Sequence, residues 1–280
     1  MDVLKQITHI SHLRDARAAL PESVGLVPTM GYLHEGHISL VKRARQEVAS
    51  VIVSIFVNPT QFAPTDDLDA YPRDLERDAA LLQEAGADLL WTPTPDVMYP
   101  PDFQTWVDVE RLTQPLEGIK RPGHFRGVTT VVAKLFNAVQ PQKAFFGQKD
   151  AQQVAVIRQM VRDLNMPVEI VALPIVRERD GLAMSSRNTY LNPAERQAAL
   201  VLSKSLDAAK SAYQAGERDA EALRKLMREI INAEPLARLE YVSCADYGSL
   251  AELDEIGGKA LLSMAVYIGS TRLIDNHVLA

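Results

Sequence analysis

One stretch near the front of the chain predicts its architecture, and it reads Gly25-Leu26-Val27-Pro28-Thr29-Met30-Gly31-Tyr32-Leu33-His34-Glu35-Gly36-His37. The apolar run 24–27 predicts a strand, Pro28 opens a short glycine-containing loop, and apolar residues after Gly36 recur with helical spacing. In an open parallel sheet, ligands bind beyond the carboxyl ends of the strands, and the N–H groups that start a following helix favour anions. We therefore expect a phosphate site here, with His34 and His37 on one side of the helix entrance.

The spacing of this stretch argues against three familiar site types. A Gly-x-Gly-x-x-Gly dinucleotide fingerprint occurs nowhere in the chain. Gly31 and Gly36 have the glycine spacing of a phosphate loop, but His37 stands where that loop needs lysine. A zinc protease places its two histidines four residues apart, whereas His34 and His37 are three apart. A structural alternative stays open, in which one histidine caps or packs the helix start and the other lies at the surface.

Composition restricts the class of protein. The chain has 280 residues, 47% of them hydrophobic, and Lys+Arg 30 against Asp+Glu 36 gives a formal charge of −6. A mildly acidic chain is not a general nucleic-acid binder, so we expect no nucleic-acid partner. Cys244 is the only cysteine, which excludes an intrachain disulfide and favours a reducing cytosol. No apolar stretch approaches the ~20 residues of a membrane helix and no signal-peptide pattern follows Asp2, so the expected location is cytoplasmic, with no membrane partner.

Polar residues follow the next predicted strand. Residues 50–57 are nearly continuously apolar and rich in β-branched side chains, as in a central parallel strand, and they lead into Asn58-Pro59-Thr60-Gln61-Phe62. Gln61 is therefore expected at the same rim as His34 and His37. Ordinary turn chemistry explains Asn58 before a proline, but it gives no reason for Gln61.

The chain then predicts a helix, a strand and a stiff loop. Residues 72–85 form the expected helix, which Gly86 stops, and residues 87–91 form the strand. Four prolines between residues 92 and 103 predict an irregular loop at the rim. The acidic cluster within residues 66–69 is typical of a solvated helix entrance, with Mg²⁺ held through water as the alternative.

The densest basic run of the chain is Arg121-Pro122-Gly123-His124-Phe125-Arg126-Gly127, and a helical pattern over residues 128–139 follows it. Cations at a helix start oppose the helix dipole, so a purely structural role is disfavoured there. Arginine and histidine at this position favour a site for phosphate or carboxylate.

A further strand-loop-helix unit follows. Residues 143–146 predict a strand and residues 151–164 predict a helix, joined by Gly147-Gln148-Lys149-Asp150. Lys149 would stand at the carboxyl end of that strand, where its ammonium can neutralise phosphate charge. Gln153, three residues beyond Asp150, can face the same crevice.

The remaining chain predicts a smaller second domain, with the boundary between Arg177 and Met184. A strand over residues 167–176 is followed by a charged turn and then by Met184-Ser185-Ser186-Arg187-Asn188. Two hydroxyls and a guanidinium can clamp a phosphate, although an exposed loop has the same composition. The elements expected beyond it form a small α+β unit: helices over 193–214 and 219–233 and strands over 239–246 and 259–268.

Five motif blocks taken together resemble one family. They are Pro28 to Gly31 with His34 to His37, Phe56 to Pro59 with Gln61-Phe62, Arg121 to Gly127, Gly147 to Asp150, and Met184 to Asn188. In this order, over nearly the whole chain, they resemble the pantoate-β-alanine ligase (pantothenate synthetase) family. The resemblance implies a Rossmann-like parallel-sheet N-terminal domain of the nucleotidyltransferase superfamily, related to class I aminoacyl-tRNA synthetases, and a smaller α+β C-terminal domain. It also implies that residues 1–178 bind nucleotide and pantoate, that residues 179–280 form a lid, and that the protein is a homodimer.

The resemblance implies roles for individual residues as well. The implied catalytic residues are His37, His34, Lys149 and Arg187, with His37 donating a hydrogen bond or proton to the phosphates. Gln61 and Gln153 are implied to bind pantoate, with Gln61 also near β-alanine. Gln148 departs from the family pattern, which has an acidic residue there. The implied ATP-binding residues are Met30, Gly31, Tyr32, Leu33, His34, Glu35, Gly36, His37, Gly147, Gln148, Lys149, Asp150, Val176, Met184, Ser185, Ser186 and Arg187.

The implied activity is the ATP-dependent condensation of (R)-pantoate with β-alanine through a pantoyl adenylate. The implied partners are these small molecules, with ATP entering as its Mg²⁺ complex and no permanently bound protein metal. The residues themselves, without the resemblance, indicate an α/β enzyme that handles phosphate. Two other hypotheses fit that description: a different nucleotidyltransferase with another acceptor, and a nucleotide-binding protein without catalysis.

Overall fold

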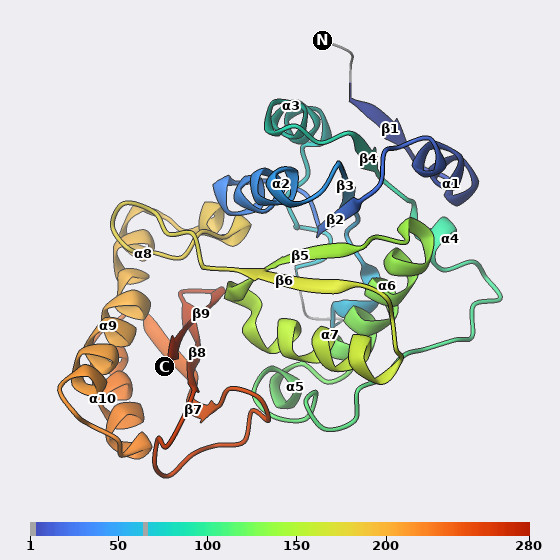
Figure 1. Cartoon of the computed structure of the whole chain (residues 1–280). Coiled ribbons are helices and arrows are strands. Elements are labelled where there is room, and N and C mark those ends of the chain that lie inside the picture. The colour runs from blue at the N-terminus through green and yellow to red at the C-terminus, as the bar shows by residue number, and fades with distance from the viewer. Residues whose placement is uncertain (1–3, 64–66) are drawn as a thin grey trace. The chain divides into compact units, whose positions relative to one another are not determined.

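The computed structural model describes residues 4–63 and 67–280 and divides into two compact units. The first unit comprises Met1–Gln148 and Gln153–Pro174, and the second comprises Lys149–Gln152 and Ile175–Ala280. Figure 1 labels the elements of both. Asp2, and Asp66 of the acidic cluster, lie outside the described residues.

The chain alternates helices and strands until residue 173, after which helices precede a run of strands. The helices are α1 (Ile10–Ala18), α2 (Glu35–Glu47), α3 (Leu75–Ala85), α4 (Pro95–Met98), α5 (Glu117–Lys120), α6 (His124–Val139), α7 (Ala151–Asp163), α8 (Pro193–Ala198), α9 (Leu200–Gln214) and α10 (Ala220–Asn232). Single 3₁₀ turns are η1 (Pro59–Gln61), η2 (Gln148–Asp150) and η3 (Ser186–Tyr190). The strands are β1 (Lys5–Ile7), β2 (Val24–Thr29), β3 (Ser50–Ile55), β4 (Leu89–Trp91), β5 (Lys143–Gly147), β6 (Glu169–Leu173), β7 (Ala237–Asp246), β8 (Ala260–Ile268) and β9 (Thr271–Leu279). Within the described ranges, no helix has the length and apolarity to cross a membrane.

A parallel sheet organises the first unit. Its six strands, counted over the described residues, lie in the order β1-β4-β3-β2-β5-β6. β2 pairs with β3 over Val24–Thr29 and with β5 at Gly25 and Leu26. From β2 the chain moves outward through β3 and β4, and it then returns to build β5 and β6 on the other side. The order therefore reverses between β2 and β5, which is where open parallel sheets bind ligands.

Apolar side chains are buried on both faces of this sheet. Helices α2 and α3 cover one face, where Val27 and Leu82 belong to the same buried cluster, and α6 and α7 cover the other, with Leu26 and Val131. Leu26 and Val27 reach different clusters because successive strand residues point to opposite faces. Two covered faces require continuous apolar strands, and the predicted parallel α/β architecture is confirmed.

Helix α3 begins later than predicted because of its cap. Asp74 accepts a hydrogen bond from Arg77 N–H at 3.1 Å, so the helix starts at Leu75 and not at Pro72. It ends at Gly86, which has a φ of 87° and closes the last turn in the left-handed conformation, as predicted.

The second unit is the predicted small α+β unit. Its antiparallel sheet has the order β7-β8-β9 and packs against α9 and α10. The buried cluster between them includes Leu206, Met227, Leu262 and Leu273. Burying one such side chain stabilises the fold by about 1.5–3 kcal/mol.

Several predicted boundaries were wrong. Strands β1 and β9 were missed, because β1 has three residues and β9 carries polar residues at buried positions. The single helix expected over 193–214 is α8 and α9, which meet at Ala199. Ala199 keeps right-handed helical angles (φ −59°, ψ −20°), so the apolar periodicity of the sequence continues through the break and does not reveal it. The loop expected over 92–103 contains the short helix α4.

Candidate functional site

Strands β2 and β5 flank the reversal of strand order, and each is followed by a segment that is predicted to bind the nucleotide. β2 ends at Thr29 and β5 at Gly147. Gly31 and Tyr32 follow β2 with φ values of 86° and 49°, so the chain turns through left-handed conformations directly after the strand. A Cβ atom on Gly147 would meet no heavy atom within 4 Å, which leaves open space beside the end of β5.

His34 and His37 together cap helix α2. His34 Nδ1 accepts a hydrogen bond from Gly36 N–H at 3.1 Å, and His37 Nδ1 accepts one from His34 N–H at 3.3 Å. The ring centroids are 4.1 Å apart. A ring nitrogen that accepts a hydrogen bond carries no proton, so each neutral ring carries its proton on Nε2. Both imidazoles are thus Nε2–H donors, and the alternative in which only one histidine caps the helix is wrong.

The backbone at this helix start is less available to an anion than predicted. Gly36 N–H is bonded to the His34 ring, and the N–H groups of His37 and Ile38 donate to His34 O at 2.8 and 3.1 Å. These three amides therefore already have acceptors within the protein. A ring N–H group is a hydrogen-bond donor of the kind that binds phosphate oxygens.

A buried carboxylate holds the loop that precedes the two histidines. Asp78 of α3 accepts hydrogen bonds from Tyr32 N–H at 2.6 Å and Leu33 N–H at 2.8 Å, and its side chain is 1% exposed. Arg77 donates to Leu33 O at 3.0 Å and lies over the Tyr32 ring. Burial raises the pKa of the Asp78 carboxyl, while the two backbone N–H donors lower it. Asp78 was not identified as a site residue from the sequence. Its spacing, three residues after Leu75 and four before Leu82, places a carboxylate among the apolar residues of a helix, and this pattern could have indicated a buried polar contact.

Gln61 is held by a network centred on Asn58, which is 1% exposed. Asn58 Nδ2 donates to Gln61 Oε1 at 3.1 Å, and Asn58 Oδ1 accepts from the Tyr99 hydroxyl at 2.8 Å. Gln61 Nε2 in turn donates to Met30 Sδ at 3.1 Å. Turn chemistry thus explains Asn58 only in part, because its side chain also holds Gln61, whose amide contacts Met30 in the loop after β2.

The basic run before α6 supports the Gln61 loop. His124 Nδ1 donates to Gln61 O at 2.8 Å, and Arg121 donates to the same oxygen at 3.3 Å. At Gly127, a Cβ atom would overlap the Thr60 carbonyl, so only glycine lets α6 approach this closely. Arg121 Nη1 also lies 3.2 Å from His124 Nε2, so the two side chains that hold Gln61 O contact each other. This arrangement favours a role in positioning Gln61.

The second unit carries the other predicted nucleotide residues. Met184 N–H donates to Val176 O at 3.0 Å, which closes the turn between them. Ser185 Oγ accepts from Arg187 N–H at 3.3 Å and caps η3, in which Ser186 is buried. The main chain of Lys149 is fixed by Asn276, whose Nδ2 donates to Lys149 O at 2.8 Å.

The structure therefore groups the predicted residues by unit. The first unit contains residues 30–37, 147, 148 and 153 with Gln61, and the second contains residues 149, 150 and 176 with residues 184–187. The His34–His37 pair and the Met30–Gln61 contact are direct. That both groups line one cavity stays a prediction, as does each assigned role.

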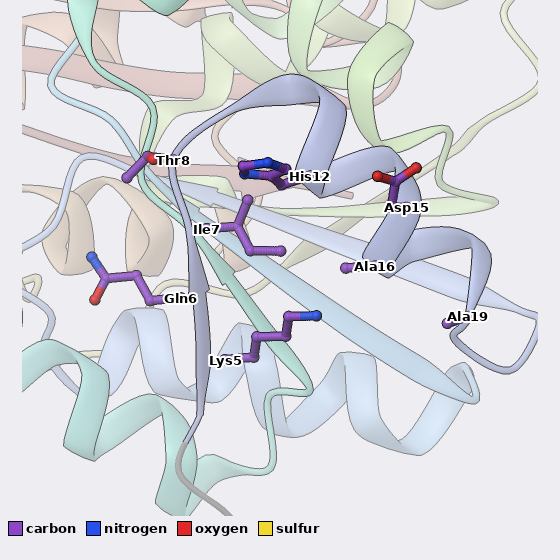
Figure 2. Close-up of a pocket in the computed structure, with 8 residues that line it drawn as sticks. All are labelled: Lys5, Gln6, Ile7, Thr8, His12, Asp15, Ala16 and Ala19. Atoms are coloured by element: carbon purple, nitrogen blue, oxygen red, sulfur yellow. The ribbon is translucent and has the colours of Figure 1, made fainter.

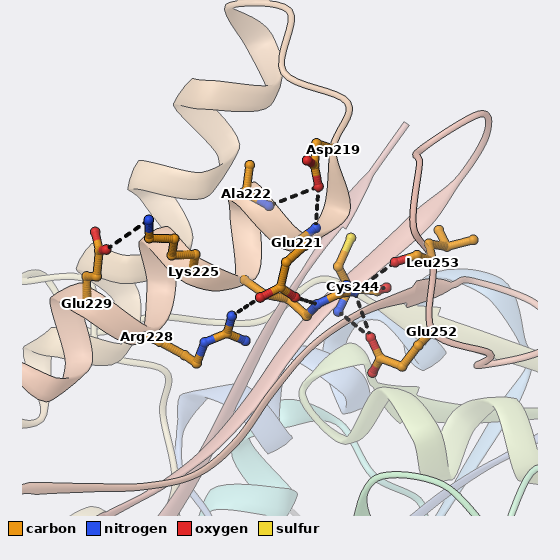
Figure 3. A network of polar contacts seen from close by, with 10 residues as sticks. Asp219, Glu221, Ala222, Lys225, Arg228, Glu229, Cys244, Glu252 and Leu253 are labelled. Atoms are coloured by element: carbon orange, nitrogen blue, oxygen red, sulfur yellow. Dashed lines mark hydrogen bonds and ion pairs between the residues drawn. The ribbon is translucent and has the colours of Figure 1, made fainter.

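Cys244 is not placed as a nucleophile. It lies on β7 with its side chain fully buried, and burial raises the pKa of its thiol to about 11. Its backbone N–H donates to Glu252 Oε2 at 3.3 Å in the polar network that Figure 3 shows. Arg224 completes this network, since it donates to Leu253 O at 2.8 Å and pairs with Glu221 at 2.7 Å. These contacts anchor the β7–β8 connection to α10.

A separate pocket lies against β1 and α1 and contains none of the predicted site residues. Figure 2 shows its lining, with apolar Ile7 and Ala16 between the polar side chains of Lys5, His12 and Asp15. In residues 4–63 and 67–280, no group of three or more His, Cys, Asp or Glu side chains is arranged to hold a metal ion.

Comparison with known proteins gives one family over nearly the full length. The family model of pantoate-β-alanine ligase matches residues 2–278. A pantothenate synthetase of Roseiflexus sp. (strain RS-1) is 61% identical over 276 residues, which cover 99% of both chains.

Two solved structures are similar to this chain. Pantothenate synthetase from Thermus thermophilus has a TM-score of 0.94 and 50% identity, and the match covers 98% of this chain and 99% of that one. Pantoate-β-alanine ligase from Francisella tularensis, complexed with beta-gamma ATP and β-alanine, has a TM-score of 0.80 and 34% identity, with coverage of 98% and 97%.

Proposed function

Because this chain belongs to the pantoate-β-alanine ligase family, we propose that the residues grouped above perform the two steps of that family's reaction. The enzyme condenses (R)-pantoate with β-alanine, consumes ATP, and releases pantothenate, AMP and pyrophosphate through a pantoyl adenylate. The family resemblance predicted from the five motif blocks is confirmed. The observation that carries the assignment is the family match over residues 2–278, joined to a capped histidine pair at the strand-order reversal.

The first step joins two anions, so it needs concentrated positive charge. The pantoate carboxylate attacks the α-phosphorus of ATP, and pyrophosphate leaves. Lys149 and Arg187 neutralise charge that builds on the phosphates, while His34 and His37 donate Nε2–H to phosphate oxygens. Support for the histidines comes from their Nδ1 contacts, which fix both rings before ATP arrives. Donors fixed in advance need no reorganisation at the moment of reaction.

The second step needs positioning and exclusion of water. The amine of β-alanine attacks the acyl carbon of the adenylate, and AMP leaves with the bonding electron pair. A mixed anhydride hydrolyses readily, so holding pantoate and β-alanine together matters more than further acid catalysis. Gln61 and Gln153 bind pantoate, and Gln61 also lies near β-alanine. The fixed side-chain amide of Gln61 supports this role. No acyl-enzyme forms, which is in keeping with the raised pKa of Cys244.

The nucleotide is held by both groups of residues. In the first unit these are Met30 to His37 with Gly147 and Gln148. In the second they are Lys149, Asp150, Val176 and Met184 to Arg187. Residues 1–178 act as the nucleotide- and pantoate-binding domain, and residues 179–280 act as the lid. Mg²⁺ enters as part of the ATP substrate, the enzyme acts in the cytoplasm, and it is a homodimer.

Pyrophosphate exchange tests this function. Radioactive pyrophosphate should enter ATP when pantoate is present and β-alanine is absent, because adenylate formation is reversible. A panel of other carboxylic acids should support little exchange. Exchange that depends on a different acceptor would point to another nucleotidyltransferase, and ATP binding without exchange for any acid would point to a non-catalytic nucleotide-binding protein.

A further inference from the structure

Strand β9 of the second unit carries two consecutive buried polar residues. Asp275 is 2% exposed and Asn276 is 3% exposed, although Leu273 and Leu279 on the same strand belong to the apolar core. Burying a carboxylate and an amide is unfavourable unless each is hydrogen bonded. Because neighbouring residues of a strand point to opposite faces, the two side chains leave β9 on different sides. The hydrogen-bond partners of the two side chains therefore show which segment of the chain contacts each side of β9.

Asp275 holds the turn that precedes the predicted nucleotide-binding segment Met184–Arg187. Its two carboxylate oxygens accept hydrogen bonds from Arg177 at 2.7 and 2.9 Å, a bidentate pair. The same guanidinium donates to Gly181 O at 3.0 Å, and Arg177 forms a β-bridge with Ala183. The turn is thus tied at both ends, and Met184 follows it directly. Asp275 fixes where the Met184–Arg187 segment starts.

Asn276 holds the main chain of Lys149. Its Nδ2 donates to Lys149 O at 2.8 Å, across 127 residues of sequence. Lys149 lies in the 3₁₀ turn η2, immediately before α7. A carbonyl held in such a turn fixes the peptide plane, and with it the direction in which the lysine side chain leaves the main chain. Asp275 and Asn276 are also linked to each other, since Asn276 N–H donates to Asp275 Oδ1 at 2.8 Å.

We propose that Asp275 and Asn276 are positioning residues for adenylate formation, which set the distance between Lys149 and the Met184–Arg187 segment from the two faces of one strand. The proposal rests on the proposed function, in which Lys149 and Arg187 act on the phosphates. A displacement of about 1 Å in such groups costs roughly a hundredfold in rate, so rigid support of both is required.

The variant Asn276→Leu tests the proposal, because leucine is close to asparagine in length and branching but has no donor. We expect the kcat of pantoate-dependent pyrophosphate exchange to fall roughly 10- to 100-fold. In a Lys149→Ala background the same change should have little further effect, since residues that act through one another are not additive. Ser243→Ala is the matched control. Ser243 is also buried in this sheet, but it lies on β7 and pairs with Ser263 of β8, so exchange should stay at the wild-type rate.

The variant Asp275→Asn tests the other face. It keeps the shape of the side chain but removes the charge that pairs with Arg177, so KM for ATP should rise about tenfold for loss of a charge-assisted contact. Thermal unfolding of every variant shows whether it is folded, and Asn276→Ser replaces Asn276→Leu if the latter is not.

The outcomes separate this proposal from the function on which it rests. If the wild-type enzyme exchanges pyrophosphate with pantoate but Asn276→Leu does so equally fast, or if its effect multiplies with that of Lys149→Ala, Asn276 does not position Lys149 and the function stands. An unchanged KM for ATP in Asp275→Asn removes Asp275 from the proposal. Absence of pantoate-dependent exchange in the wild type overturns the function and this proposal together.

Discussion

At the scale of single residues, the chemistry of the site depends on which atoms of each side chain already form hydrogen bonds within the protein. His34 and His37 use Nδ1 to hold backbone N–H groups, so the fold selects the tautomer that has its proton on Nε2. One pair of rings therefore serves both as a helix cap and as a pair of donors. The spacing of the two histidines was readable from the sequence, but this division between their nitrogens was not.

Replacement of His37 should slow adenylate formation. His37→Ala should lower the kcat of pyrophosphate exchange roughly a hundredfold, the scale for removal of one preorganised donor. His37→Asn should be similarly slow, although its short amide can still accept from His34 N–H and so keep the cap. His12→Ala is the control, because His12 is an exposed residue of the separate pocket and should retain wild-type exchange. Wild-type exchange in both His37 variants would remove this residue from the mechanism.

Cys244 should make the protein sensitive to alkali. The pKa of its thiol is raised by burial from 9.0 to about 11, so the native state keeps a proton that the unfolded chain loses above pH 9. Stability should therefore fall between pH 9 and pH 11, by roughly 3 kcal/mol from this group. Denaturant unfolding across this range should show a shallower loss for Cys244→Ala than for the wild type. An equal dependence of the unfolding free energy on pH in the two proteins would contradict a raised pKa for the Cys244 thiol.

At the scale of elements, loops near the site are held by side chains that helices bring to them from elsewhere in the chain. Asp78 on α3 holds the Tyr32–Leu33 backbone, and the start of α6 holds Gln61 O. Sequence patterns predicted both helices because apolar periodicity is a local property. They did not predict these contacts, since the partners are brought together by packing across the sheet and not by spacing along the chain.

Substitution of Asp78 should impair activity more than it impairs folding. In Asp78→Asn an NH2 group replaces one of the two oxygens that accept from the loop N–H groups. One loop N–H group then loses its acceptor, so exchange should fall about tenfold while stability falls by roughly 1–3 kcal/mol. Leu82→Ala on the same helix should cost about 2–5 kcal/mol of stability and leave kcat unchanged, because Leu82 packs in the core. Kinetics measured well below the unfolding temperature, with denaturant unfolding, separate the two effects. Equal kcat values for the two variants would argue against a role of Asp78 in holding the Tyr32–Leu33 loop.

A methyl group at Gly127 should displace the Gln61 loop. Gly127→Ala places a Cβ atom on the Thr60 carbonyl, so we expect a higher KM for pantoate and a loss of about 1–3 kcal/mol of stability from overpacking. Gly257→Ala is the control, because a Cβ atom there meets nothing within 4 Å. Initial rates at varied pantoate give the comparison, and an unchanged KM in Gly127→Ala would show that α6 does not position Gln61.

At the scale of the whole molecule, each compact unit has its own sheet and its own buried apolar core, and each carries part of the predicted nucleotide site. Lys149 belongs by its contacts to the second unit although its neighbours Gln148 and Gln153 belong to the first. A division drawn along the sequence cannot show this, because a boundary placed at one position assigns every earlier residue to one domain.

The proposed homodimer gives a direct prediction at this scale. Light scattering coupled to size-exclusion chromatography should give twice the chain mass of 31.0 kDa, at concentrations used for activity assays. The mass should stay the same in Asn276→Leu, because that residue is buried within one unit. A mass of one chain for active wild-type enzyme would rule the homodimer out.

The sequence by itself determined the parallel α/β architecture, the small α+β unit, the family, and the segments that leave strands at their carboxyl ends. These follow from local signals, namely apolar periodicity, glycine and proline punctuation, and motif order. The tertiary structure alone decided which ring nitrogen of each histidine holds the backbone, that Asp78 and Asn58 hold the loops, and that Asp275 and Asn276 tie distant segments to one strand. The physical reason is that a buried polar side chain is explained by its hydrogen-bond partner, and these partners lie up to 127 residues away in the chain.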